Sequence, residues 1–159
     1  MDQFLPTGKI KPELLKDIIQ RAPVFDHRIV LGPGIGLDCG VIDGGDHYLV
    51  MKTDPITFAT EEIGWYAVQI SANDIATTGA KPEWMMITAL LPEKSTTEQL
   101  ILEITDQIYQ AAAEINISLV NAHTEITVDL NRPILVCSLI GEAEKDRLVT
   151  PKGVRPGNE

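Results

Sequence analysis

The sequence predicts an α+β domain in which a sheet carries helices on one of its faces. Short apolar runs of strand length alternate along the chain with segments of helical period. Apolar residues make up 44% of the 159 residues and aromatic residues only 5%, which indicates an aliphatic core. This length is about that of one domain and is sufficient for a sizeable core.

The first expected element is a short helix over residues 11–21, within an N-terminal helical segment that spans residues 1–28. Pro12 suits the first turn of a helix, where a missing N–H costs nothing. The apolar residues recur at the spacing of one helical face: Leu14, Leu15, Ile18 and Ile19.

A glycine-rich loop and a hairpin are expected next. The run Leu31–Gly36 reads Leu-Gly-Pro-Gly-Ile-Gly, in which the backbone can approach another group closely. It resembles a phosphate cradle but lacks the Lys-Ser/Thr of a P-loop, so a simple turn is the alternative. Two strand-like runs, Cys39–Asp43 and Tyr48–Thr53, flank Gly44-Gly45-Asp46 and predict a hairpin.

A second helix is expected over residues 61–78. Gly79 and Pro82 predict its end, since glycine adopts the left-handed cap and proline cannot continue a helix. The helix carries Asn73 and Asp74 among small and apolar residues. An ionised Asp in such a helix loses hydration unless a positive or donating group faces it, and a metal-bound phosphate is one candidate.

The remaining elements complete the alternation. Met85–Leu91 is a predicted strand, and Ser95–Glu98 offers the N-cap of a long amphipathic helix. Ser118–Ala122 and Pro133–Gly141 are two further predicted strands. Residues 146–159 are polar and rich in Gly and Pro, and we interpret them as a linker toward a C-terminal domain that the chain does not include.

Charge and composition exclude several classes of protein. A formal charge of −10 argues against a surface that grips nucleic acid, although divalent cations can bridge carboxylates to phosphates. No apolar run reaches the roughly 20 residues needed to span a bilayer, and the first residues do not read as a signal peptide. Cys39 and Cys137 form no metal-binding pattern and are expected to be buried thiols. We therefore expect a cytoplasmic protein with neither membrane nor nucleic-acid partners.

Four carboxylates stand at turns, strand ends or in a helix: Asp38, Asp54, Asp74 and Glu125. Carboxylates at successive strand ends would converge on one edge of a sheet, which suits magnesium shared with the phosphates of a nucleotide. Lys52 could neutralise phosphate or simply pair with Asp54. His123 could act near neutral pH, although a single strand-end His is more often structural.

In their order along the chain, these segments resemble the N-terminal domain of the superfamily of aminoimidazole ribonucleotide (AIR) synthetase. That superfamily includes selenophosphate synthetase, thiamine-monophosphate kinase and a hydrogenase maturation protein. The most specific segment is Asn73–Pro82, which resembles the pattern N-D-x-x-x-x-G-A-x-P. The other matching segments are short: Gly36–Val41, Thr53-Asp54, His123–Glu125 and Arg155–Gly157.

The resemblance implies a mainly antiparallel or mixed four-stranded sheet over residues 29–145, with helices on one face and a homodimer formed through the sheet. It also implies a site for ATP and Mg²⁺. By that match Asp38, Asp54 and Asp74 would lie on the metal or phosphate side, and the supporting contacts would be Asn73, Thr124 and Glu125. The implied chemistry is ATP-driven phosphoryl transfer to an amide, carbonyl or phosphate acceptor, closest to the hydrogenase-maturation and thiamine-monophosphate-kinase branches.

Two segments depart from the pattern. Leu37 replaces the first Asp of a G-D-D segment, and Ala122-His123 replaces a Gly-Gly approach to the strand-end acid. These departures leave an alternative open, in which the fold is kept as a catalytically inactive dimerisation or regulatory module. The acceptor substrate is not predicted by the sequence.

Overall fold

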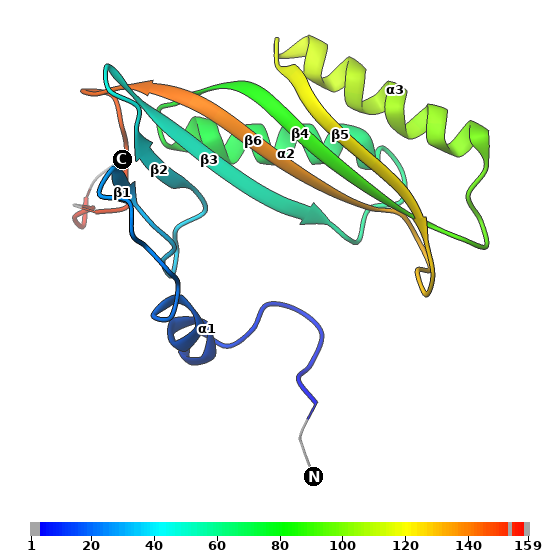
Figure 1. Cartoon of the computed structure of the whole chain (residues 1–159), viewed down its shortest axis with the longest axis horizontal. Helices are drawn as coiled ribbons and strands as arrows, with labels where there is room; N and C mark the ends of the chain where they lie inside the picture. The colour runs from blue at the N-terminus through cyan, green and yellow to red at the C-terminus, as the bar shows by residue number, and fades with distance from the viewer. Residues whose placement is uncertain (1–3, 153, 158–159) are drawn as a thin grey trace.

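The computed structural model describes residues 4–152 and 154–157, and it shows an α+β fold (Figure 1). The last residues of the predicted linker, Asn158 and Glu159, together with Gly153 and residues 1–3, lie outside the described residues. The elements follow in this order: α1 (Pro12–Ile19), β1 (Ile29–Leu31), β2 (Gly40–Asp43), β3 (His47–Ile56), α2 (Ile63–Thr77), β4 (Lys81–Pro92), α3 (Glu98–Glu114), β5 (Ser118–Thr127) and β6 (Ile134–Glu144).

The strands form a mixed sheet in the order β1-β2-β3-β6-β4-β5. β4 and β5 are parallel and are joined through α3, whereas the other neighbouring strands are antiparallel. The long strands β3, β6, β4 and β5 correspond to the predicted four-stranded sheet. β1 and β2 extend it to six strands, because the hairpin at Gly44-Gly45 folds β2 back along the edge of β3.

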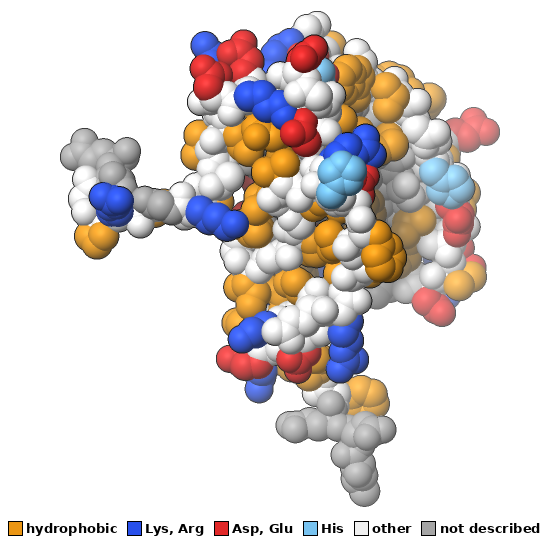
Figure 2. Space-filling view, turned by 60° about the vertical axis from the view of Figure 1, so that its left-hand side comes forward, with side chains coloured by type: hydrophobic (Ala, Val, Ile, Leu, Met, Phe, Trp, Pro, Cys, Tyr) orange, Lys and Arg blue, Asp and Glu red, His pale blue; other side chains and the backbone are white. Residues whose placement is uncertain are grey.

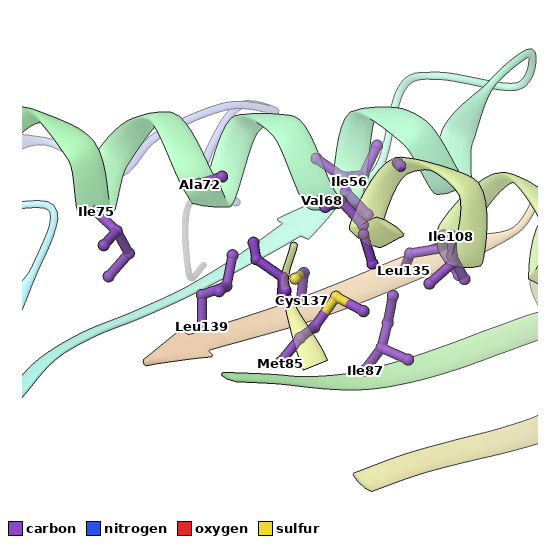
Figure 3. Close-up of a cluster of buried hydrophobic side chains, with 14 of the residues drawn as sticks. Ile56, Val68, Ala72, Ile75, Met85, Ile87, Ile108, Leu135, Cys137 and Leu139 are labelled. Carbon is purple, nitrogen blue, oxygen red and sulfur yellow. The ribbon is translucent and has the colours of Figure 1, made fainter. Parts of the chain in front are cut away.

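The helices α2 and α3 cover one face of the sheet, and the core lies between them and the strands (Figure 3). Alternate residues of β6 enter this core, with Leu135, Cys137 and Leu139 fully buried. Side chains of both helices and of β4 pack against them, among them Val68, Ile75, Met85 and Ile108. Each such side chain contributes about 1.5–3 kcal/mol by leaving water.

The opposite face of the sheet is left uncovered by the helices of the described chain. At its centre Thr53, Ser138 and Met86 pair across β3, β6 and β4. The Ser138 hydroxyl donates to the Thr53 hydroxyl at 2.9 Å, and Met86 is 37% exposed. We call this surface the open face of the sheet.

The predicted helix boundaries are confirmed to within two or three residues. Thr97 caps α3, since its side chain accepts a hydrogen bond from the backbone N–H of Leu100 at 3.1 Å. α2 ends before Gly79, whose φ of +79° is the left-handed conformation expected at this position. Beyond β6, Val149 donates its N–H to the Thr78 carbonyl at 2.8 Å, so the first part of the predicted linker is anchored to the end of α2.

The N-terminal helix α1 forms as predicted but buries none of its residues. Figure 1 shows it standing away from the sheet below β1 and β2. Figure 2 shows that the Lys and Arg side chains on this side of the molecule form small, separated groups rather than a continuous basic surface. Among the described residues, no helix combines the length and the apolar character needed to cross a membrane.

Candidate functional site

The side chain of Lys52 lies among three carboxylates, and we call these four residues the Lys52 cluster. Its Nζ lies 2.8 Å from Oδ2 of Asp74, 3.7 Å from Oδ1 of Asp38 and 3.9 Å from Oδ2 of Asp54. The Lys52 side chain is only 7% exposed, while those of Asp38, Asp54 and Asp74 are 68%, 40% and 27% exposed. The ammonium is therefore inside the cluster, and the carboxylates form its outer surface.

Three segments that are distant in sequence supply this cluster. Alternation along β3 places Lys52 and Asp54 on the same side as the buried Val50 and Ile56, toward the helices. Asp74 lies in the last turn of α2, which packs over β3 and β6. Asp38 lies two residues after the glycine-rich loop and two before β2, the neighbour of β3.

Opposing effects act on the pKa of Lys52. Burial is the largest single effect and lowers the pKa, because it penalises the charged form. The hydrogen bond to Asp74 and the attraction of Asp54, Asp74 and Asp38 outweigh it, so the pKa ends above its ordinary value. Lys52 is thus a cation at neutral pH, and three carboxylates around one ammonium leave an excess of negative charge.

The two thiols are buried, as predicted. Cys39 Sγ donates to the Asp74 carbonyl at 3.4 Å, and burial followed by repulsion from Asp74 raises the pKa of Cys39 to about 11. Burial likewise raises the pKa of Cys137 to about 11. Both are therefore neutral thiols at neutral pH, and neither has the thiolate character of a nucleophile.

The donor chemistry of the cluster fits magnesium only in part. Carboxylate oxygens are the ligands that Mg²⁺ prefers, and proteins commonly hold it through one or two carboxylates together with phosphates of the substrate. Among the described residues, however, no group of three or more His, Cys, Asp or Glu side chains is arranged to enclose a metal ion. The cluster therefore suits a cation that arrives with a phosphate ligand better than one enclosed by protein alone.

Two hollows adjoin the cluster. One, of about 390 Å³, is lined by Asp38, by residues of β1, the glycine-rich loop and β2, and by Met51 and Thr53 of the open face; Leu37 also lines it. The other, of about 290 Å³, is lined by Asp54 together with Phe58, Tyr66 and Ile70. The departure at Leu37 thus places an apolar side chain where the resemblance expects a carboxylate.

The structure does not bring every predicted residue to the cluster. Asn73 is exposed on α2, one residue before Asp74. Thr124 and Glu125 lie on β5, at the far edge of the sheet, separated from β3 by β6 and β4. Thr124 lines a cavity of about 60 Å³ against α3.

Glu125 also lies on the other side of the sheet from the cluster. It pairs with Leu90 on the open face, and His123 Nε2 is 3.4 Å from its Oε2. The expected convergence of strand-end carboxylates therefore does not include Glu125 within one chain, because the last strand, β6, inserts between β3 and β4. Strand order in the sequence is not strand order in the sheet.

The central position of Lys52 is the feature that sequence reasoning left undecided. The sequence offered phosphate or Asp54 as its partner, whereas its nearest partner is Asp74. One signal was available, since residues two apart on a strand share a face and Lys52 precedes Asp54 by two. The contact with α2 could not be read from that spacing.

Comparison with known proteins gives a consistent assignment. Residues 36–143 match the sequence model of the family "AIR synthase related protein, N-terminal domain". A protein of Methanocaldococcus jannaschii described as a hydrogenase expression/formation protein is 29% identical over 160 residues, which cover 95% of this chain and 47% of that protein. The chain thus spans about half the length of the relatives it matches.

Two solved structures show the same fold. A ThiL structure complexed with AMPPCP and TMP superposes with a TM-score of 0.69 at 20% identity, covering 90% of this chain and 43% of that one. The hydrogenase maturation protein HypE in complex with ATP superposes with a TM-score of 0.62 at 22% identity, covering 89% of this chain and 38% of that one. At this level of identity the likeness establishes the fold.

Proposed function

The chain belongs to the family of AIR synthase related protein N-terminal domains, and on that premise we propose that it binds the phosphates of ATP together with Mg²⁺ at the Lys52 cluster. The observation that carries the proposal is the convergence of Asp38, Asp54 and Asp74 on one buried ammonium. Two structures of the same fold are complexes with ATP and with AMPPCP, which supports nucleotide use.

In this role the carboxylates would supply negative charge and fix the position of the magnesium ion. Asp54 and Asp74 each have an oxygen near Lys52 and remain partly exposed, so their outer oxygens are available to a magnesium ion on a phosphate. The ion, when bound, would neutralise phosphate charge and help to orient the transferred group. Asp38 would provide a further oxygen on the side of the glycine-rich loop.

Asn73, Thr124 and Glu125 remain proposed supporting contacts. Asn73 adjoins Asp74 and could reach a ligand at the cluster of its own chain. Thr124 and Glu125 lie across the sheet from it. In a supporting role Glu125, on the open face, would reach a second copy rather than the cluster of its own chain, whereas Thr124 faces α3.

We further propose that the domain forms a homodimer through the open face of the sheet. The helices leave this face uncovered, and it presents Met51, Met86, Ile140 and Val136 between short polar side chains. An apolar sheet face without a covering layer is typical of a surface that another element buries. A second copy would bury both open faces at once.

The wider activity is a proposal about a longer protein. The relatives are about twice as long as this chain, and we propose that residues 146–159 lead to a second domain that supplies the acceptor side. The parent would act in the cytoplasm and transfer a phosphoryl group to an amide, carbonyl or phosphate acceptor. Catalysis of that kind depends on positioning and charge neutralisation.

One observation favours a second candidate function. Leu37 lies in an apolar hollow beside Asp38, where a carboxylate would otherwise strengthen the hold on a cation. If nucleotide binding has been lost, the domain would serve as a dimerisation or regulatory module. That candidate predicts a stable dimer without nucleotide affinity.

Calorimetric titration of ATP, with and without Mg²⁺, tests the proposal. We expect binding that depends on Mg²⁺ and weakens by about tenfold or more in Asp54→Asn and Asp74→Asn, because a charged ligand group is lost. Asp106→Asn, an exposed position on α3, is the matched control. Wild-type affinity in both cluster variants would refute the assigned roles, and a dimer that binds no ATP would establish the second candidate.

A further inference from the structure

Lys52 occupies the place that a metal ion would take among the three carboxylates. Its ammonium lies within 4 Å of an oxygen from each of Asp38, Asp54 and Asp74, with the nearest at 2.8 Å. The side chain approaches from beneath, along β3, and only 7% of it is exposed. A cation coming from solvent therefore meets carboxylates whose inner oxygens already face a positive charge.

Two electrostatic consequences follow. Without Lys52 the cluster would carry three negative charges close together, which is a strong attraction for a free divalent cation. With Lys52 in place, repulsion between ammonium and metal opposes that binding. Phosphate oxygens bound to the metal bring negative charge toward the same ammonium. Their attraction to Lys52 then outweighs the repulsion between Lys52 and the metal.

We propose that Lys52 is a positioning residue that makes the cluster selective for Mg²⁺ carried by a nucleotide over free Mg²⁺. It holds Asp38, Asp54 and Asp74 together before the ligand arrives, so no metal ion is needed to screen their repulsion. This inference rests on the proposed function, because that proposal identifies the ligand as a nucleotide with Mg²⁺. Its central claim, that Lys52 keeps free Mg²⁺ out, concerns the chain alone.

The geometry separates this role from a simple surface ion pair. Exposed pairs between long side chains contribute little and hold no fixed arrangement. Here the cation is buried, its partners come from β3, α2 and the loop before β2, and the ion pair with Asp74 joins the sheet to the helix above it. Loss of the ammonium would leave three carboxylates facing one another, the most costly of them being Asp74 because it is the least exposed.

The test compares wild type with Lys52→Met, which keeps the aliphatic stem and removes the charge, and with Lys52→Arg, which keeps the charge. Thermal unfolding is followed in millimolar MgCl₂ and in NaCl of equal ionic strength, without nucleotide. We expect no Mg²⁺-specific rise in Tm for wild type or Lys52→Arg, and a clear rise for Lys52→Met. Titration of Mg²⁺–ATP should then show affinity weakened by about tenfold or more in Lys52→Met, a change opposite in sign to its response to free Mg²⁺.

The double variant Lys52→Met/Asp74→Asn returns the cluster to two negative charges and should lose the response to free Mg²⁺. A Lys52→Met chain that folds only when Mg²⁺ is added would support the inference. A wild-type chain that is itself stabilised by free Mg²⁺, or a Lys52→Met chain with no greater response than wild type, would overturn it. If wild type binds no nucleotide, the proposed function fails while the response to free Mg²⁺ still decides the role of Lys52.

Discussion

The backbone N–H of Gly64 donates to Oε1 of Gln107 at 3.0 Å, and this bond joins the first turn of α2 to the middle of α3. A Cβ at position 64 would lie 2.7 Å from Cβ of Gln107 and 2.7 Å from the carbonyl oxygen of Ile104. The two helices therefore touch through glycine, and their separation fixes how both lie on the sheet.

This contact predicts that Gly64→Ala destabilises the domain, although Ala is the better helix former. Overpacking of this kind costs about 1–3 kcal/mol, which exceeds the roughly 0.5–1 kcal/mol that Ala gains over Gly within a helix. Urea unfolding measures the difference. Gln107→Ala is the control: it removes the hydrogen bond but keeps the Cβ that crowds position 64. It therefore measures the bond alone, and it should not restore the loss when combined with Gly64→Ala.

The left-handed residue at the end of α2 predicts a second effect. Gly79 has φ +79°, and a Cβ there would lie 2.4 Å from the carbonyl oxygen of Arg147. Gly36 has φ +73° with no atom within 4 Å of its added Cβ. Gly36→Ala should thus cost only the conformational strain, about 1–2 kcal/mol, and Gly79→Ala clearly more. Equal losses in the two variants would contradict a role for the Arg147 contact.

The open face predicts how the oligomeric state responds to charge. Met86→Lys places an ammonium at the centre of that face, opposite Ser138, and should convert the proposed dimer to monomer. Sedimentation velocity measures the change. Leu102→Lys is the matched control, since Leu102 is 64% exposed on the outer side of α3, and it should leave the dimer intact. A monomeric wild type would count against the dimer itself.

The raised pKa values of the thiols predict alkaline destabilisation. Both thiols have an ordinary pKa of 9.0 and a folded pKa of about 11, so the unfolded chain loses these protons first. Their contribution to stability is fully present below pH 9 and is lost as pH rises through about 11. Urea midpoints measured between pH 8 and pH 10.5 test this, and Cys137→Ala should show a smaller alkaline loss than wild type. Native wild type should also react slowly with iodoacetamide at pH 8, since both thiols are buried and neutral.

Elements with local signals could be predicted from the sequence. The cap at Thr97, the stop at Gly79 and the hairpin at Gly44-Gly45 each depend on a few adjacent residues, and each forms as expected. The free energy that favours each of them comes from contacts between residues of a single turn, so distant contacts do not change the outcome.

The arrangement of the site depended on pairings that no local pattern encodes. Placement of β6 between β3 and β4 removes Glu125 from the cluster and could not be inferred from strand order. The ion pair between Lys52 and Asp74 joins a strand to a helix across the sheet surface, and periodicity gives no information about that distance. Periodicity did indicate correctly that Lys52 and Asp54 share a face.

The central position of β6 has a consequence for biosynthesis. Its register with β3 joins Ile56 to Leu135 and His47 to Glu144, and with β4 it joins Lys81 to Glu142. Until Glu144 has left the ribosome, β3 and β4 each expose an unpaired edge. Over the same period α2 can pack against β3 but not against β6. Such long-range pairing favours slow folding that is completed only after this strand emerges. The nascent domain therefore exposes these strand edges until β6, the last strand of the described chain, has emerged.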